Sequence, residues 1–192
     1  MIISIPKEIT PGESRVAIIP ATIKEYIKKG ITVKIESGAG DGSFITDEEY
    51  KSAGAEILTD TKELFANSDF ILKVNSPIMN ESLDLHEADM MKEGSAFVSF
   101  FQTTIEKEAV QKLTSNKITG FSMHLVPRTT LAQKMDALSS QSNIAGYKAV
   151  LLGASHIGKY MPLLMTAAGT IQPAKVLIIG AGVAGLQAIA TA

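Results

Sequence analysis

The chain has 192 residues with 18 basic and 20 acidic side chains, and its net charge of −2 gives no electrostatic reason to expect a nucleic acid or an anionic membrane surface as a partner. Hydrophobic residues make up 45% of the chain and the mean hydropathy is +0.17, which excludes an intrinsically disordered protein. The absence of cysteine excludes disulfides, thiolate nucleophiles and iron–sulfur clusters, and the three widely separated histidines lead us to predict no metal site.

Residues 1–125 alternate short apolar runs with polar runs that are compatible with helices. The N-terminus has no basic leader followed by an apolar run, so we expect no secretory signal. Six strands with intervening helices predict one parallel α/β domain. The predicted strands are Ile2–Ile5, Thr32–Ile35, Glu56–Leu58, Phe70–Val74, Ala96–Phe100 and Ile118–Phe121.

Helix ends in this region have recognisable signals. Thr46–Glu49 and Thr103–Glu106 both fit the capping box, in which a Thr and a Glu three residues later bond the free N–H groups of a first turn. Gly30 and Gly54 stand where a helix ends in a left-handed residue. The run Gly38–Ser43 has no following lysine of the kind found in a P-loop, so it predicts a turn and not a phosphate site.

Two cations of the first domain are candidates for a carboxylate-binding site. Lys73 lies in an apolar strand, where a cation is expected only near the strand end, and ligands of open α/β sheets bind at that edge. Arg15 is the second cation. The structural alternative is an ion pair with Glu8 or Glu36, and the residues themselves leave both interpretations open.

The pattern changes from about residue 139 onward, because a long run of apolar and small residues, Asn143–Tyr160, predicts a helix that leads from the first domain into a second. Pro173 ends that segment, and a strand is predicted at Lys175–Ile179. We divide the chain into an α/β domain at 1–138, a helical linker at 139–172 and the start of a second Rossmann-like domain at 173–192. Only residues 181–192 follow Gly180, whereas a βαβ unit needs about 30, so we expect this second domain to be incomplete.

The run Gly180-Ala181-Gly182-Val183-Ala184-Gly185 follows the last predicted strand and precedes a helical start at Leu186–Ala192. Gly180 would make the tight turn, Gly182 would admit a pyrophosphate close to the backbone, and Gly185 would allow close helix packing. The helix N-terminus at Val183 and Ala184 would offer N–H groups to the phosphates. The run therefore predicts dinucleotide binding. A purely structural glycine turn is the alternative, and Gln187 with the glycines argues against a membrane span.

The segment 126–140 joins the predicted domains and concentrates polar groups. A nicotinamide carboxamide needs a donor for its oxygen and an acceptor for its NH₂ group, and Arg128 and Asp136 could provide these, with Ser139 able to do either. The structural alternative makes Asp136 the N-cap of the next helix and Arg128 a solvated surface charge.

Several short sequence motifs along the chain resemble those of the alanine dehydrogenase and proton-translocating transhydrogenase family. The resemblance rests on Ile3–Glu8, Arg15–Ala17 with Pro20, Glu36–Gly40, and Leu72–Val74 with Pro77. A similarity to the transhydrogenase alpha-subunit branch rests on Val126–Arg128, Asp136–Ser140, Asn143–Tyr147 and residues 173–185, so that the resemblance covers the whole chain.

The resemblance implies a soluble homodimeric component at the cytoplasmic face of a membrane. It implies that the component binds NAD(H) and passes hydride to NADP⁺ on a separate component, coupled to proton flow through a membrane-spanning component. In that family an Arg-Gln-Asp loop and a following Ser hold the nicotinamide and its ribose, and these positions fall on Arg128, Gln133, Asp136 and Ser139. On this basis the segment is assigned a binding role, and no general base is required, because two nicotinamides exchange hydride directly.

The alternative from the same resemblance is an NAD-dependent alanine dehydrogenase. In that branch Arg15 and Lys73 would hold the substrate carboxylate, but a histidine is used where this chain has Phe100-Phe101-Gln102. Without an imidazole there, proton transfer in amine oxidation lacks its agent, which favours the transhydrogenase. A nucleotide-sensing module without catalysis is a third interpretation that the residues leave open.

Overall fold

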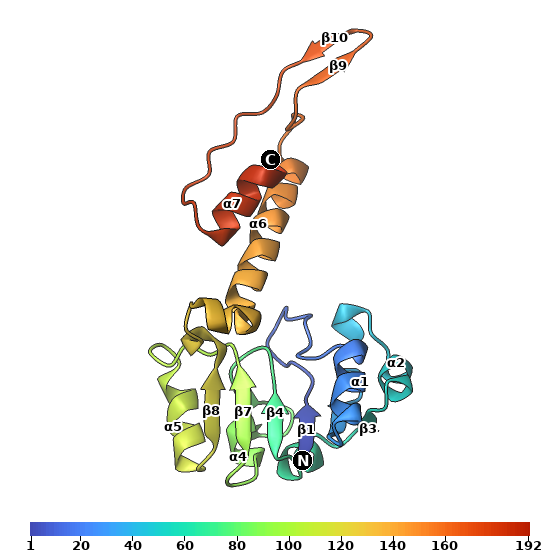
Figure 1. The fold of residues 1–192 in the computed structure, drawn as a ribbon, viewed down its shortest axis with the longest axis vertical. Helices are drawn as coiled ribbons and strands as arrows, with labels where there is room; N and C mark the ends of the chain where they lie inside the picture. The colour runs from blue at the N-terminus through green and yellow to red at the C-terminus, as the bar shows by residue number, and fades with distance from the viewer. The chain divides into compact units, whose positions relative to one another are not determined.

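The computed structural model describes residues 1–192 and divides into two compact units, Met1–Leu125 and Val126–Ala192 (Figure 1). The boundary lies earlier than the predicted one at residue 138. Residues 126–138, which the sequence analysis placed in the first domain, therefore belong to the second unit.

Unit 1 is built on a six-stranded parallel sheet, and all six predicted strands are confirmed to within two residues at either end. The strand order is β3-β2-β1-β4-β7-β8, the order of a Rossmann-type doubly wound sheet. The order reverses between β1 and β4, which pair in parallel through Ile3 with Phe70 and Ser4 with Ile71. The strands are β1 (Ile2–Ile5), β2 (Thr32–Glu36), β3 (Glu56–Leu58), β4 (Phe70–Leu72), β7 (Ala96–Ser99) and β8 (Thr119–Ser122).

Helices connect these strands, and a small hairpin that the sequence analysis did not predict lies between β4 and β7. The hairpin consists of β5 (Met79–Asn80) and β6 (Leu85–His86). The helices are α1 (Pro20–Lys28), α2 (Asp47–Ser52), α3 (Thr61–Ala66), α4 (Glu87–Met90) and α5 (Lys107–Ser115), with short 3₁₀ helices at Asp41–Ser43 and Met123–Leu125.

Two core clusters lie on opposite faces of the sheet. One joins Ile23 of α1 and Tyr50 of α2 to residues of β1 and β2, including Ile35. The other joins Phe65 of α3 and Leu113 of α5 to residues of β4, β7 and α4. This arrangement follows from right-handed crossovers, because helices that precede and follow the reversal of strand order pack on different faces.

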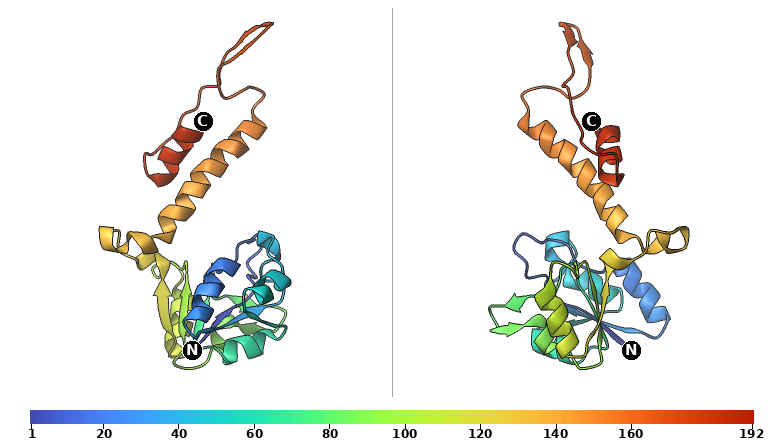
Figure 2. Two further views of the ribbon diagram at one scale, coloured as in Figure 1. Left: turned by 45° about the vertical axis from the view of Figure 1, so that its right-hand side comes forward. Right: turned by 90° about the vertical axis from the view of Figure 1, so that its left-hand side faces the viewer.

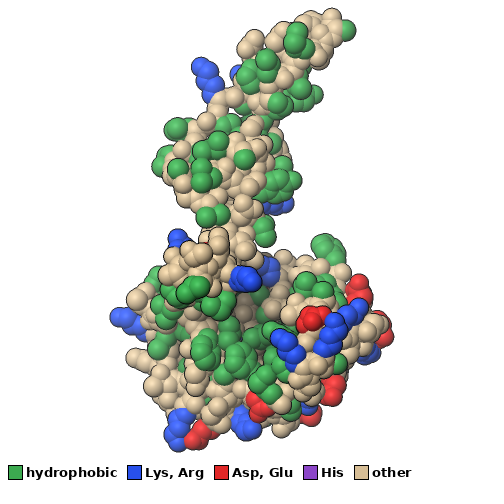
Figure 3. Space-filling view, viewed as in Figure 1, with side chains coloured by type: hydrophobic (Ala, Val, Ile, Leu, Met, Phe, Trp, Pro, Cys, Tyr) green, Lys and Arg blue, Asp and Glu red, His purple; other side chains and the backbone are tan.

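The first face is covered only over β1, β2 and β3. On the view in Figure 3, hydrophobic side chains gather over β4, β7 and β8, where no helix of unit 1 lies. Phe121 is 51% exposed there and stacks on Phe70 with ring centroids 6.2 Å apart. Parallel sheets are ordinarily covered on both faces, whereas the helices of unit 1 leave this half of the face open.

One predicted capping box is confirmed and the other is wrong. The Thr46 side chain accepts from the Glu49 N–H, and the Glu49 carboxylate accepts from Thr46 N at 2.8 Å. At the second position α5 begins only at Lys107 and has no side-chain cap, because the Glu106 carboxylate accepts instead from Gln102 N and Ser76 Oγ. Gly30 and Gly54 have φ of 72° and 102°, as predicted for helix ends, and Gly38–Ser43 forms the predicted turn.

Unit 2 contains the long helix α6 (Ala137–His156), a hairpin of β9 (Leu164–Thr166) and β10 (Gly169–Ile171), and helix α7 (Val183–Thr191), which Figure 2 shows beside α6. A helix was predicted at Asn143–Tyr160. The observed helix α6 begins earlier, at Ala137, and ends at His156, before the hairpin. The predicted strand Lys175–Ile179 is wrong: these residues form no strand, since a parallel strand needs neighbours and none pairs with them. No helix is long and apolar enough to cross a membrane.

The two Thr-x-x-Glu strings give a matched test of capping. We expect Thr46→Ala to lower the free energy of unfolding by ~1 kcal/mol, because it leaves an N–H of α2 without its side-chain acceptor. Thr103→Ala should change it by less than about 0.5 kcal/mol, because Thr103 caps no helix. Urea unfolding followed by circular dichroism measures both, and equal losses would contradict the assignment.

Candidate functional site

The polar segment at the start of unit 2 leads directly into α6. Thr129 has extended backbone, residues Thr130–Met135 form a 3₁₀ helix, and Asp136 is the N-cap of α6. Ala132 is buried, whereas Leu131 beside it is 96% exposed. Arg128, Thr129, Thr130 and Gln133 are exposed, so the segment presents these polar side chains outward.

Three of the four residues predicted to hold a nicotinamide line one cavity of about 250 Å³. They are Arg128, Gln133 and Asp136. The fourth, Ser139, contacts the cavity through Asp136: the carboxylate accepts from Ser139 N at 3.0 Å and from Ser139 Oγ at 2.6 Å. Pro127, Thr129 and Thr130 complete the lining.

Asp136 is the helix cap that the structural alternative predicted, and it also faces the cavity. The hydrogen bonds from the Ser139 side chain and backbone, aided by the charge of Arg128, lower the pKa of the Asp136 carboxyl below its ordinary value. At neutral pH this carboxylate is ionised and can only accept hydrogen bonds. The two interpretations are therefore compatible, since the cap fixes the position of the acceptor.

Arg128, Gln133 and Asp136 together form a donor and acceptor set that is complementary to a primary amide. A guanidinium donates only, an amide side chain does both, and a carboxylate accepts only. A carboxamide has one acceptor oxygen and one donor NH₂ group, so the residues that line the cavity fit a nicotinamide ring substituent.

The glycine turn before α7 has a different steric requirement at each glycine. Gly180 has φ of 104°, which disfavours residues with a Cβ. A Cβ on Gly185 would lie 1.9 Å from the Gly180 carbonyl oxygen, so the helix can approach the turn only because that atom is absent. A Cβ on Gly182 would meet nothing within 4 Å, which leaves open space beside the backbone where a phosphate is predicted.

The N-terminal end of α7 has no side-chain cap. Gly182 is the N-cap residue, and the first turn carries no acidic side chain. The N–H groups at the start of α7, near Val183 and Ala184, therefore present the positive end of the helix dipole without compensation, which suits an anion.

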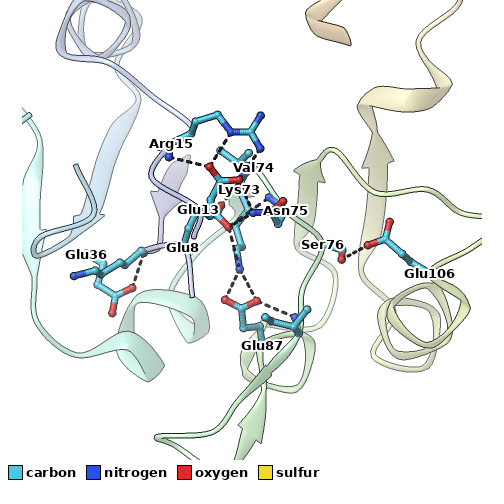
Figure 4. A network of polar contacts seen from close by, with 12 residues as sticks. Glu8, Glu13, Arg15, Glu36, Lys73, Val74, Asn75, Ser76, Glu87 and Glu106 are labelled. Atoms are coloured by element: carbon cyan, nitrogen blue, oxygen red, sulfur yellow. Dashed lines mark hydrogen bonds and ion pairs between the residues drawn. The ribbon is translucent and has the colours of Figure 1, made fainter. Parts of the chain in front are cut away.

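The two cations of unit 1 lie in a network of polar contacts at the point where the strand order reverses (Figure 4). Lys73 follows β4, and its Nζ donates to both carboxylate oxygens of Glu87 at 2.5 Å. Glu8, which follows β1, lies 3.8 Å from the same Nζ. The side chains of Lys73, Glu8 and Glu87 are 0%, 3% and 2% exposed, respectively.

Backbone N–H groups complete this buried cluster. The Glu8 carboxylate accepts from Val74 N at 2.6 Å and from the Asn75 side chain at 3.2 Å, and Glu87 accepts from Ile78 N at 3.0 Å. Burial raises the pKa of the Glu87 carboxyl, although Lys73 opposes the shift.

Arg15 pairs with a carboxylate two residues earlier in the chain. Its Nε and Nη2 donate to the two oxygens of Glu13 at 2.8 and 2.6 Å, and Asn75 Nδ2 donates to Glu13 at 2.9 Å. The bonds from Arg15 lower the pKa of Glu13 to about 2. Both cations that were candidates for binding a substrate carboxylate are thus engaged by carboxylates of the chain itself.

The structural alternative, an ion pair with Glu8 or Glu36, is confirmed for Lys73 through Glu8. The Glu36 carboxylate instead accepts from Lys7 N at 2.8 Å and from Thr61 Oγ1 at 2.5 Å. The main partner, Glu87, was missed, because Leu85–Met90 mixes apolar residues with two carboxylates, Glu87 and Asp89, and nothing in the sequence shows which of the two is buried.

His124 is a second residue that the sequence analysis missed. Its ring lies edge-on to Phe100 with centroids 6.1 Å apart, and its Nδ1 is buried without a hydrogen-bond partner. Phe100-Phe101-Gln102 stand where a histidine was expected for an alanine dehydrogenase. His124 nevertheless supplies an imidazole at this edge of the sheet. No group of three or more His, Asp or Glu side chains is arranged to hold a metal ion.

Comparison with known families identifies matches over most of the chain. Residues 4–145 match the family model described as alanine dehydrogenase/PNT, N-terminal domain, and residues 149–192 match alanine dehydrogenase/PNT, C-terminal domain. The boundary between the two matches lies within α6.

Individual relatives come from both branches of this family. The chain is 46% identical over its full length to the first part of the NAD(P) transhydrogenase alpha subunit of Rhodospirillum rubrum, of which it covers 50%. It is 37% identical over 98% of its length to an alanine dehydrogenase of Methanococcus maripaludis, of which it covers 49%. A crystal structure of transhydrogenase from Sinorhizobium meliloti superposes with a TM-score of 0.91 at 41% identity, over all of this chain and 55% of the other. The chain thus spans about half the length of these relatives.

The buried cluster predicts a non-additive response to substitution. Lys73→Met should destabilise unit 1 by ~3 kcal/mol or more, because Glu87 is then a buried carboxylate without its cation. Adding Glu87→Leu should restore part of the loss, since it removes one of the two buried carboxylates, and Glu8 keeps its hydrogen bonds from Val74 N and Asn75. Urea unfolding of the two variants measures this, and a double variant less stable than Lys73→Met would contradict it.

Proposed function

The chain belongs to the alanine dehydrogenase/PNT family, and from this premise we propose that it is the NAD(H)-binding part of a proton-translocating transhydrogenase. The single observation that carries the proposal is the cavity where Arg128, Gln133 and the ionised Asp136 meet. Its donors and acceptor match the nicotinamide carboxamide, and the glycine turn before α7 offers a second, phosphate-compatible feature in the same unit.

The residues of the polar segment and of the glycine turn would make different contacts with the coenzyme. Asp136 accepts from the carboxamide NH₂, Arg128 donates to the carboxamide oxygen, and Gln133 can bond either group. Ser139 keeps the Asp136 carboxylate in place through two hydrogen bonds. Gly180, Gly182 and Gly185, with the N–H groups of Val183 and Ala184, hold the pyrophosphate.

The reaction requires orientation more than acid–base chemistry. When held by Arg128, Gln133 and Asp136, NADH would supply the hydride, and a separate component would hold the NADP⁺ that accepts it. Arg128, Gln133 and Asp136 limit the rotation of the carboxamide and thereby fix which face of the ring is presented. No side chain of this segment has to move a proton.

The proposal extends to the assembly that the relatives' names suggest. The R. rubrum and S. meliloti proteins are named as transhydrogenases, the first as an alpha subunit, which supports a multi-component complex. We propose that this chain acts as a homodimer at the cytoplasmic face of a membrane. We further propose that it acts with an NADP(H)-binding and a membrane-spanning component, and that hydride transfer is coupled to proton movement.

Alanine oxidation is the second candidate, supported by the M. maripaludis relative and by the imidazole of His124 at the sheet edge. The paired cations count against it. A substrate carboxylate would have to displace Glu13 from Arg15 or Glu87 from Lys73, and Lys73 is fully buried. A buried cation with two carboxylate bonds is a poor site for a further anion.

Asp136→Asn tests the binding role. Asparagine caps helices as well as aspartate does, so the fold should be retained. It replaces one acceptor oxygen by a donor, so we expect hydride transfer from NADH to an NADP⁺ analogue to fall by about 10-fold or more. The assay uses the full chain with an NADP(H)-binding component.

Asp60→Asn is the matched control, because Asp60 caps α3 through Glu63 N and has no part in the proposed site. Its transfer rate should equal that of the unaltered chain. An unchanged rate in Asp136→Asn, with its circular dichroism unchanged, would remove the segment from the binding site.

Alanine turnover separates the two candidate functions. We expect no NAD⁺-dependent oxidation of L-alanine by the full chain, because Arg15 and Lys73 are paired internally. NADH absorbance measures this directly. Robust alanine oxidation without transfer to NADP⁺ would reverse the order of the two candidates.

A further inference from the structure

Helices α6 and α7 approach so closely at one point that only glycine fits. A Cβ built on Gly146 would lie 2.1 Å from the Ala184 carbonyl oxygen and 3.0 Å from Ala184 Cα. These are backbone atoms of the first turn of α7, which cannot rotate away as a flexible side chain would. Gly146 therefore brings the backbone of α6 against the N-terminal end of α7.

Asn143, one turn earlier on α6, makes a second contact with the same helix. Its Nδ2 donates to Gln187 Oε1 at 2.9 Å, and Gln187 Nε2 donates to Thr191 Oγ1 at 3.1 Å. Gln187 is three residues after Ala184, so both contacts fall within consecutive turns of α7. One contact sets how near the helices come, and the other fixes their register.

The same helix begins at the polar cavity. Asp136 caps α6, and Ser139 lies in its first turn. Seven residues separate Ser139 from Gly146, which corresponds to roughly 10 Å along the axis of an α-helix. Since α6 is continuous over this interval, the start of α7 is held at a fixed distance from the residues that line the cavity.

We propose that Gly146 and Asn143 are positioning residues that set the spacing between the two parts of the coenzyme site. This inference rests on the proposed function, because it matters only if the cavity holds the nicotinamide and the glycine turn holds the pyrophosphate. Both groups belong to one molecule, so a change in spacing should lower the affinity only of a ligand that spans both parts. Neither residue needs to touch the coenzyme.

The test compares NADH, which spans both parts, with ADP-ribose, which lacks the nicotinamide ring that the cavity would hold. In the full chain, NADH and ADP-ribose affinities are measured by titration for the unaltered protein, Gly146→Ala and Gly153→Ala. Gly153 lies on the same helix, but a Cβ there would meet only Met161 Cε at an ordinary 3.7 Å, so it is the matched control.

We expect Gly146→Ala to weaken NADH binding by about 10-fold or more and to leave ADP-ribose binding within about 2-fold. Gly153→Ala should change neither. Loss of both ligands together, with a lowered melting temperature, would mean that Gly146 serves only the fold, and equal NADH affinity in the two glycine variants would overturn the proposal. If the unaltered chain binds ADP-ribose but not NADH, or Asp136→Asn has no effect, the proposed function fails instead.

Asn143 gives a second variant that does not depend on whether Gly146→Ala folds. Asn143→Ala and Gln187→Ala each remove the same hydrogen bond. Each should weaken NADH binding about 3-fold, and the double variant should be no worse than either single one. Additive losses, or equal losses for ADP-ribose, would contradict a role in spacing.

Discussion

The two hydrogen bonds from Ser139 to the Asp136 carboxylate are the contacts from which unit 2 is organised. They satisfy a free N–H group at the start of α6 and so fix where this 20-residue helix begins. They also lower the pKa of the Asp136 carboxyl and orient it in the cavity that Arg128 and Gln133 line. A single capping interaction thereby determines both the direction of the helix and the position of an acceptor in the cavity. For this reason the structural and the functional interpretation of Asp136 do not compete.

In unit 1, ligands of a doubly wound sheet would bind where the strand order reverses, but the charged groups there are already paired with one another. The carboxyl ends of β1 and β4 meet at the reversal of strand order, and there Lys73, Glu8 and Glu87 form a buried cluster. Arg15 is likewise bound by Glu13. The charges that a substrate would need are used within the chain, so this edge stabilises the unit. The polar groups of the cavity, in contrast, have bonds left to offer to a ligand.

The six strands of unit 1 were predictable because each buried strand is a short apolar run between turn signals, and Gly30 and Gly54 mark helix ends by a backbone conformation that favours glycine. The resemblance to a family placed Arg128, Gln133 and Asp136 in one site, and the structure puts them around one cavity. Other features depend on distant partners that the sequence does not show. Glu106 matches a capping box but bonds Ser76, thirty residues away, and Lys175–Ile179 has the composition of a strand without a strand beside it. Glu87 cannot be told from Asp89 in the sequence, yet the fold buries Glu87 against Lys73 and leaves Asp89 exposed.

The glycines of unit 2 show how a small residue can act at a distance from a ligand. Gly180 permits a turn, Gly182 leaves space, and Gly185 lets the helix approach the turn, so these three shape the turn that is proposed to hold the pyrophosphate. Gly146 belongs to none of these classes, because the atom it lacks would strike the first turn of α7 from the neighbouring helix. A motif search restricted to the glycine turn therefore omits the residue that places the turn relative to the polar segment. In a site whose proposed chemistry consists of holding one ring in a fixed orientation, we expect that separation to affect the rate together with the groups proposed to contact the ring.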